Sequence, residues 1–320
     1  MTHEPITIRS LTDAALAAPF MLGYWPDQSV CVLIVDADGH VLLIMRWHLD
    51  APDVPPHLPL SDDAEAVAFH LVVFDDRGAR EPAPWDRIAA DISARGVPLG
   101  RMAFVSGAAD DVVVHSPARG GASSAQAIHI GPEEIADLGR RWQLRPWASS
   151  REAYVADIAP DADRQAQVRD SLRAQCAVTE ATRDRAIAVT VEALMSGPGT
   201  PESVAAALTA LRDVRVRDTV LWEVMHAPVD RWTVAADSLA WAVAGAPDDH
   251  VAAPATLLAI LRWQQGDGSR AGAAVERALA ADPSYSLADL INRCLLVGLH
   301  PSTWAEGLVG LSREACRRAA

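Results

Sequence analysis

A continuous apolar run at residues 30 to 35, VCVLIV, constrains the fold of this chain more than any other stretch. A strand with one solvent-exposed face alternates apolar and polar residues. An unbroken run rich in β-branched residues is instead typical of a strand buried on both faces. The DADG that follows at residues 36 to 39 predicts a tight turn, and HVLLIMRWHL predicts the returning strand. The chain must therefore build a sheet that other elements cover on both sides.

Strand and helix patterns alternate over residues 1 to 148. LTDAALAAPFML, at residues 11 to 22, predicts a helix that Ser10 or Thr12 caps and that ends before Gly23. Strands are expected in AVAFHLVVF, RMAFVSG and DVVVH, and helices in PWDRIAADISARG and GPEEIADLGRRW. The pattern predicts an α/β or α+β domain with a mixed sheet over this part of the chain.

Residues 149 to 320 carry helical patterns, separated by short Gly, Pro or Asp breaks, and no convincing strand. Short breaks of this kind are what antiparallel helix pairs require. The stretch from Asp161 to Met195 is predicted to form one long helix, closed by SGPGTP. The second part of the chain is thus expected to be an all-α domain.

One predicted helix pair, at about residues 252 to 285, resembles a single tetratricopeptide unit. Leu258 falls at the large apolar position of the first helix. Ala271 and Ala278 fall at the small positions of the second helix, and Pro283 ends the unit. The large aromatic that such units carry near the start of the first helix is missing. Because a lone unit cannot bury its own faces, this one must pack on neighbouring helices.

The charge and the basic residues of the chain exclude several classes of function. The formal net charge is −14 and the pI is near 5.1. An acidic chain gains nothing by displacing counterions from a phosphate backbone, so nucleic acid is not an expected partner, and neither is an anionic membrane. The sequence contains no Lys. A Schiff-base lysine, a P-loop lysine and a lysine general base are therefore excluded.

The cysteine pattern and the hydropathy favour a cytoplasmic protein. The four cysteines form no C-x-x-C pair, and they are Cys31, Cys176, Cys294 and Cys316. Free thiols in apolar segments are typical of a reducing compartment. The N-terminal MTHEPITIRS lacks the pattern of a signal peptide, and no apolar run approaches the length of a membrane span.

The segment between the first helix and the first strand, GYWPDQS, admits two interpretations. In the first it is a structural corner, where Gly23 ends the helix, Pro26 fixes the turn, and Asp27 and Ser29 bond freed backbone groups. In the second, Asp27, Gln28 and Ser29 contact a ligand at the edge of the sheet. The corner is favoured because it accounts for every residue type present.

Two arginine-containing segments raise the same choice between structure and binding. In RDVRVRDTV, Arg217 and Asp218 can form a pair that ties two helices together, or Arg217 can receive a carboxylate or phosphate. Ser150 and Arg151, at the expected domain junction, are a second candidate contact. The structural pair is favoured for Arg217.

No pattern in the sequence identifies a catalytic or metal-binding residue. His48, His57 and His70 could be grouped with Asp50 or Asp53, but their spacing matches no standard ligand frame. There is no H-E-x-x-H and no G-x-S-x-G element. We therefore expect no metal and no cofactor, and assign no catalytic residue.

Several stretches, in this order, carry a family resemblance: LGYWPDQSVCVLIV, ASSREAYVADIAP, DVRVRDTVL, ATLLAILRWQQGDGSRAGAAVERALAADPSYSLADLI and GLHPSTW. Together they resemble the actinobacterial family catalogued as domain of unknown function 4192, over nearly the whole chain. The chain has VVVHSPARGGASSA where that family often carries a cysteine-rich segment. The resemblance implies a lineage and no activity.

Two functional hypotheses follow from these observations. The first is a non-catalytic interaction or scaffold protein, in which the helical domain docks another protein. The repeat-like unit and the missing catalytic frame favour it. The second is a small-molecule-binding or hydrolytic enzyme with a site between the two domains, near Asp27, Ser150, Arg151 and Arg217.

Overall fold

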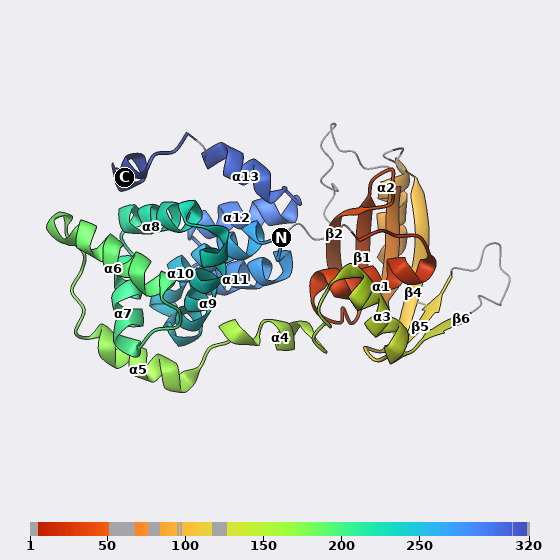
Figure 1. Ribbon diagram of the computed structural model, residues 1–320, viewed down its shortest axis with the longest axis horizontal. Helices are drawn as coiled ribbons and strands as arrows, with labels where there is room; N and C mark the ends of the chain where they lie inside the picture. Colours follow the sequence, from red (N-terminus) through yellow and green to blue (C-terminus); the bar gives the residue numbers. More distant parts are fainter. Residues whose placement is uncertain are drawn as a thin grey trace. The chain divides into compact units, whose positions relative to one another are not determined.

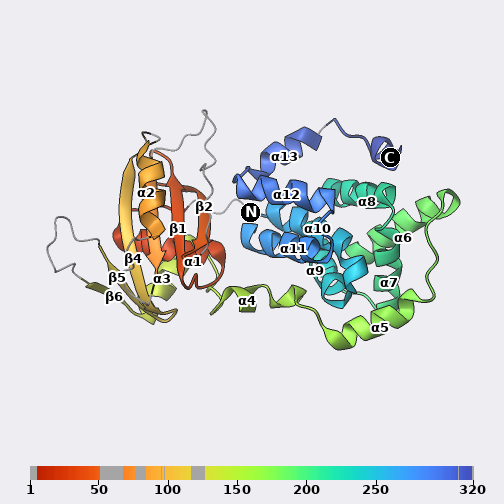
Figure 2. The ribbon, with the colours of Figure 1, turned by 180° about the vertical axis from the view of Figure 1, so that it is seen from behind.

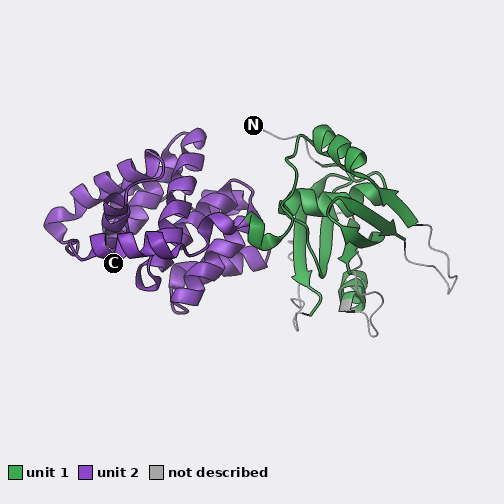
Figure 3. Cartoon of the chain, turned by 90° about the horizontal axis from the view of Figure 1, so that it is seen from below, with its two compact units in different colours: residues 1–154 green, residues 155–320 purple. Residues whose placement is uncertain are grey.

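A computed structural model describes residues 6–50, 68–75, 84–94, 96, 98–116, 127–308 and 310–318. The chain divides into two compact units, residues 1 to 154 and residues 155 to 320 (Figure 3). The first contains the sheet, and the regular elements in the described residues of the second are all helices. No helix in the described ranges combines the length and the apolar character that crossing a bilayer requires.

Unit 1 is built on a six-stranded mixed sheet with the order β2-β1-β3-β4-β5-β6 (Figure 1). Neighbouring strands are antiparallel except for β3 and β4, which are parallel and connected through a helix. The mixed sheet predicted from the sequence is thus confirmed. The strands are β1 (Ser29–Val35), β2 (Val41–His48), β3 (Ala68–Phe74), β4 (Leu99–Ala108), β5 (Asp111–His115) and β6 (Ala127–Ile130).

Helices cover both faces of the sheet, as the VCVLIV run predicts. Helices α1 (Leu11–Leu22) and α3 (Pro132–Trp142) pack on one face, where Cys31 and Leu33 of β1 point (Figure 1). Helix α2 (Pro84–Ala94) packs on the other face against Val32 and its neighbours (Figure 2). All seven residues of β1 are buried. Burial on both faces explains why this strand is apolar without alternation.

The ends of α1 follow the signals in the sequence. The Ser10 Oγ accepts from the Asp13 amide at 3.0 Å, and the Asp13 carboxylate accepts from the Ser10 amide at 2.9 Å. This reciprocal capping box satisfies two amide groups that the helix leaves free. Gly23 ends the helix with φ 81°, the left-handed conformation that favours glycine.

Unit 2 is a set of helices around one apolar core. Helices α9 and α10 each supply many of the residues buried in that core. The described residues 155–308 and 310–318 contain no strand. Its elements are the 3-10 turns η2 (Ala156–Ile158) and η3 (Glu180–Thr182), and the helices α5 (Ala162–Leu172), α6 (Arg183–Met195), α7 (Pro201–Ala210), α8 (Val214–His226), α9 (Val229–Gly245), α10 (Asp248–Gln264), α11 (Gly268–Ala281), α12 (Ser286–Leu296), α13 (Pro301–Leu308) and α14 (Arg313–Arg318).

The prediction of one long helix from Asp161 to Met195 is wrong. Helix α5 ends at Leu172, and a new start is built at Thr179, whose amide donates to Thr182 Oγ1 at 2.9 Å. Leu172 and Val178 both pack on the apolar core. A single straight helix would carry its second half away from that core, so the chain turns and returns as α6.

The predicted helix pair at about residues 252 to 285 forms a hairpin of α10 and α11. Gly266 adopts φ 82° in the turn, and the Asp267 carboxylate accepts from the Arg270 amide at 2.9 Å to begin α11. Ala271 and Ala278 are fully buried against the core, and Leu258 is almost fully buried. The helix pair is confirmed, and its likeness to a tetratricopeptide unit stays a prediction.

Candidate functional site

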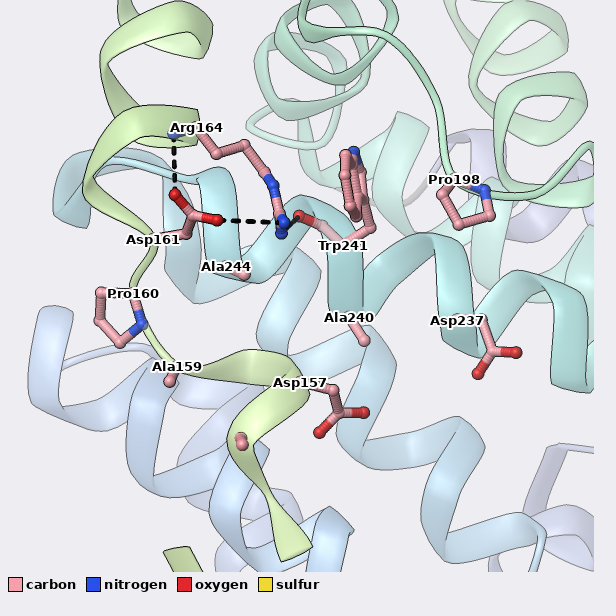
Figure 4. A pocket seen from close by; sticks show the side chains of 11 residues that line it. Asp157, Ala159, Pro160, Asp161, Arg164, Pro198, Asp237, Ala240, Trp241 and Ala244 are labelled. Carbon is pink, nitrogen blue, oxygen red and sulfur yellow. Dashed lines mark hydrogen bonds and ion pairs between the residues drawn. The ribbon is translucent and has the colours of Figure 1, made fainter. Parts of the chain in front are cut away.

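A pocket of about 550 Å³ opens on unit 2 between the η2–α5 segment and α9 (Figure 4). Its size lies within the range of small-ligand pockets in proteins. Three aspartates, one arginine and one tryptophan supply its chemistry, and alanines and prolines supply the rest of the wall. The chemically active lining residues are Asp157, Asp161, Arg164, Asp237 and Trp241.

The start of α5 is fixed on the end of α9 by backbone and side-chain bonds. The Asp161 amide donates to the Ala244 carbonyl at 2.9 Å, and the Gln165 Nε2 donates to the Ala246 carbonyl at 3.0 Å. The Asp161 Oδ1 accepts from the Arg164 amide at 3.0 Å and caps the helix. These bonds hold one wall of the pocket at a set distance from the other.

The Arg164 side chain lies flat against the Trp241 ring (Figure 4). Its guanidinium carbon is 3.5 Å from the ring centroid, and its Nη2 is 3.1 Å from Asp161 Oδ2. A cation over an indole face is a favourable contact, and it is stronger where water is excluded; this side chain is 19% exposed. A Cβ at Gly245 would approach Arg164 Cγ and Cδ to 2.8 Å. Glycine at this position therefore permits the stack.

A buried arginine lies behind two of the carboxylates. The Arg262 side chain is 10% exposed, and its Nη2 lies 2.9 Å from Asp237 Oδ1 and 4.0 Å from Asp157 Oδ2. The two carboxylates are 55% and 40% exposed, so both also face the solvent. Three carboxylates and two guanidinium groups leave this pocket with one net negative charge.

The lining groups are suited to binding contacts. None of the lining residues carries a hydroxyl, thiol or imidazole group. The half-exposed carboxylates accept hydrogen bonds, and Trp241 with Ala240 and Ala244 offers apolar surface. A cation on an apolar stem matches this combination.

The sequence-predicted residues Asp27 and Ser29 lie at the corner between α1 and β1. Ser29 is fully buried, and its Oγ donates to the Asp27 carbonyl and accepts from Arg46 Nε, both at 2.7 Å. The Trp25 amide donates to the Ala148 carbonyl at 2.9 Å. Asp27 is exposed. The bonds of Ser29 are thus internal to the corner, while the Asp27 carboxylate faces solvent.

Ser150 and Arg151 begin α4 (Arg151–Tyr154), the last element of unit 1. The Ser150 Oγ accepts from the Ala153 amide at 3.1 Å. The pKa of Glu152 is lowered, mainly because its carboxylate accepts a hydrogen bond from its own amide and a second from the Ser150 hydroxyl. Ser150 therefore acts as a local helix cap.

Arg217 and Asp218 lie in unit 2, on α8. The Arg217 Nε donates to Asp218 Oδ1 at 2.8 Å, and its Nη1 donates to the Tyr285 hydroxyl at 2.9 Å. Tyr285 immediately precedes α12. The Arg217–Asp218 pair lies within α8, and the bond from Arg217 to Tyr285 joins α8 to the start of α12.

The histidines considered as metal ligands lie in different settings. His48 is exposed at the end of β2, and His57 and Asp53 lie outside the described residues. The His70 ring is buried, and its Nδ1 accepts from the Arg101 amide at 2.8 Å. Burial, and next the charge of Arg101, lower the pKa of His70 to about 4. This imidazole is neutral, and its hydrogen bond with the Arg101 amide links β3 to β4.

One group of potential ligands that the sequence reasoning missed lies at the turn between β1 and β2. Ligand atoms of Asp36, Asp38 and His40 lie within 4.8 Å of one another. The Asp36 Oδ1 accepts from the amides of Asp38 and His40 at 2.9 and 2.8 Å. This arrangement is that of a side chain closing a turn, so the turn alone accounts for the group.

The sequence reasoning also missed the pocket itself. No pattern in the sequence singled out Asp157, Asp237 or Arg262. The one local signal was Asp161, whose position before an amphipathic segment is typical of a helix cap. Its packing against α9 depends on residues about eighty positions away, which spacing does not reveal.

A family model described as Domain of unknown function (DUF4192) matches residues 13–302. No curated protein and no solved structure matches the chain.

Proposed function

The chain belongs to the DUF4192 family, and we propose that it is a non-catalytic protein-interaction protein whose helical unit binds a basic side chain of a partner protein. The binding site is the pocket of Asp157, Asp237 and Trp241. One observation carries the proposal: two half-exposed carboxylates flank a single opening and share one buried guanidinium group. The pocket therefore keeps negative charge that faces the solvent.

Electrostatics supports a cationic occupant. The pocket has one net negative charge, and the whole chain has −14. A surface of one charge sign raises the local concentration of oppositely charged segments and speeds their association. A basic segment of a partner protein is thus attracted before any specific contact forms.

The shape and the lining support an arginine or lysine side chain. Such side chains carry a charged head on an apolar stem, and the stem gains from contact with apolar surface. Trp241, Ala240 and Ala244 offer that surface, and the Asp157 and Asp237 carboxylates accept from the head. A guanidinium head is also planar, and it can donate two parallel hydrogen bonds to one carboxylate.

A binding role is favoured over a catalytic one by the composition of the lining. No hydroxyl, thiol or amine lines the pocket, and its three carboxylates are paired with Arg164 or Arg262, which disfavours their use as nucleophiles. The proposal also takes the α10–α11 hairpin as a tetratricopeptide-like unit, supported by the buried Leu258, Ala271 and Ala278. It places the protein in the cytoplasm, supported by four free cysteines.

The test uses the full chain and a pair of peptides that differ in charge alone. Calorimetry compares acetyl-Gly-Arg-Gly-amide with the same peptide carrying citrulline, the neutral isostere of arginine. We expect the arginine peptide to bind and the citrulline peptide to fail. Equal binding of the two peptides would show that the pocket does not select a cation and would overturn the proposal.

A matched pair of variants then assigns the binding to this pocket. Asp237→Asn removes one carboxylate at the opening. Asp163→Asn makes the same change on α5 at an exposed position outside the lining. We expect the first variant to weaken arginine-peptide binding and the second to leave it unchanged. Affinity purification of the three proteins from the native cell then compares the retained partners, and the same pattern is expected.

A further inference from the structure

A second, larger pocket of about 750 Å³ lies elsewhere on unit 2. The end of α5, the end of α7 and the starts of α8 and α10 form its walls. Its lining includes two arginines, Arg212 and Arg215, with His250 and the Gln175 amide beside them. Two guanidinium groups in one cavity are a local reversal of charge in a chain of net charge −14.

The guanidinium group of Arg215 is available to a ligand. The Arg215 amide donates to Asp213 Oδ1 at 2.9 Å, but no acceptor among the described residues lies within bonding distance of its guanidinium group. The side chain is half-buried. A half-buried cation without an internal acceptor gains from an anion that enters the pocket.

Arg212 is oriented toward the same cavity by its neighbours on α10. Its Nη1 lies 3.4 Å from His250 Nε2, and His250 Nδ1 lies 2.9 Å from Asp249 Oδ1. The imidazole ring thus lies between the Asp249 carboxylate and the Arg212 guanidinium. Arg212 is exposed, so its remaining donors face the solvent and the pocket.

The only carboxylate in this lining is already engaged. Asp213 Oδ1 accepts from the Arg215 and Val216 amides and thereby caps α8, and its Oδ2 accepts from Arg183 Nε at 3.2 Å. The charges of Asp213 and Arg183 offset each other. The two lining arginines, Arg212 and Arg215, therefore set the sign of the pocket.

We propose that this pocket binds the phosphate group of a small organic phosphate ester. A phosphate dianion matches two guanidinium groups in charge and offers three terminal oxygens to their donors and to Gln175. Leu172, Val178 and Val214 line the same cavity and supply apolar contact for the organic part. This site is separate from the first pocket, and it stands whether or not that pocket binds a basic side chain.

Calorimetry on the full chain tests the site with three probes at fixed ionic strength: phenyl phosphate, inorganic phosphate and benzoate. We expect phenyl phosphate to bind more tightly than inorganic phosphate, because the ring contacts the apolar wall. Benzoate should bind weakly, since it carries one charge and two oxygens. Benzoate binding as tight as that of phenyl phosphate would overturn the choice of phosphate, and absence of phenyl phosphate binding would overturn the site.

Two variants locate the binding. Arg215→Gln removes a charge that has no internal acceptor, so the fold should be preserved while phenyl phosphate binding falls about tenfold. Arg185→Gln makes the same change at an exposed position of α6 outside the lining, and binding should not change. Equal loss in both variants would show unspecific attraction and refute the site. Thermal unfolding of each variant confirms that the fold is intact.

Discussion

The guanidinium carbon of Arg164 lies 3.5 Å from the centroid of the Trp241 ring, although 77 positions separate the two residues in the chain. The contact joins the first turn of α5 to the last third of α9. The contact forms one wall of the acidic pocket. The Arg164 guanidinium interacts there with Trp241 and with the Asp161 carboxylate. The pocket carboxylates at Asp157 and Asp237 are therefore not neutralised by Arg164.

The Arg164–Trp241 contact should contribute measurably to the stability of unit 2. In a double-mutant cycle of Arg164→Met and Trp241→Leu, we expect a coupling free energy of about 1 kcal/mol, typical of a partly buried cation over an indole. Urea unfolding followed by far-ultraviolet circular dichroism provides the four free energies. A coupling energy near zero would mean that the two side chains contribute only independent packing.

Gly23 should not tolerate a side chain, for two separable reasons. Its φ of 81° costs an L-residue roughly 1–2 kcal/mol, and a Cβ would lie 2.4 Å from Tyr154 Cζ. Gly23→Ala should therefore lower the free energy of unfolding of unit 1 by more than the backbone cost. Gly96→Ala is the control, because Gly96 has φ 74° and open space around it. In a Tyr154→Ala background the cost of Gly23→Ala should fall to that of the control, and an unchanged cost would contradict the clash.

The stability of unit 1 should fall in mild acid because of His70. Burial, followed by the charge of Arg101, holds the pKa of His70 at about 4 in the folded chain, below its ordinary value of 6.5. As the pH falls below 6.5, His70 takes up a proton in the unfolded chain but stays unprotonated in the folded chain. Stability is thus full above pH 6.5 and is lost progressively down to about pH 4, at about 1.4 kcal/mol per pH unit.

The His70→Gln variant isolates this effect from the other histidines. Glutamine keeps an acceptor for the Arg101 amide but does not titrate. The difference in unfolding free energy between the parent and the variant should therefore depend on pH over this window. A constant difference would show that His70 does not titrate as described.

The cysteines should differ sharply in reactivity. Cys31 is fully buried, and burial raises its pKa to about 12, although the charge of Arg46 opposes the rise. Cys176 is exposed. Since the thiolate is the reactive form, iodoacetamide should modify Cys176 in the folded protein and reach Cys31 only after unfolding. Peptide mapping by mass spectrometry follows both sites, and equal rates in the folded protein would contradict this account.

The parts of the fold that follow local signals could be predicted from the sequence. The VCVLIV run required burial on both faces, and Ser10 and Gly23 marked the ends of α1, because hydrophobic periodicity and capping act over a few residues. Strand β6 was not predicted. Its four residues, AIHI, are too few to give a clear strand pattern, and its place in the sheet depends on pairing with β5.

The candidate site could not be predicted, because it depends on how helices pack. Arg262, on α10, meets Asp237 from the preceding helix α9 and Asp157 from a turn more than a hundred positions away. Each of these residues, taken alone, is typical of a solvated helix face. The error over Asp161 to Met195 has the same origin, since the chain turns there in order to return Val178 to the core.

The two members of the Arg262–Asp237 pair should change cation binding in opposite directions. Arg262→Met keeps much of the buried stem but removes the charge behind Asp157 and Asp237, and the pocket then has two net negative charges. One added charge about 4 Å from a well-solvated cation changes the interaction energy by about 1 kcal/mol. Arginine-peptide affinity should therefore rise severalfold in Arg262→Met.

Asp237→Asn should lower the same affinity by a comparable factor, because the pocket loses its net charge. It also leaves the buried Arg262 without its nearest carboxylate, which should cost about 1–3 kcal/mol of unfolding free energy. Calorimetry of the peptide with each variant, together with urea unfolding, separates binding from stability. If both variants weaken binding, the pair acts only by holding the helices in place, and the pocket does not bind its ligand through negative charge.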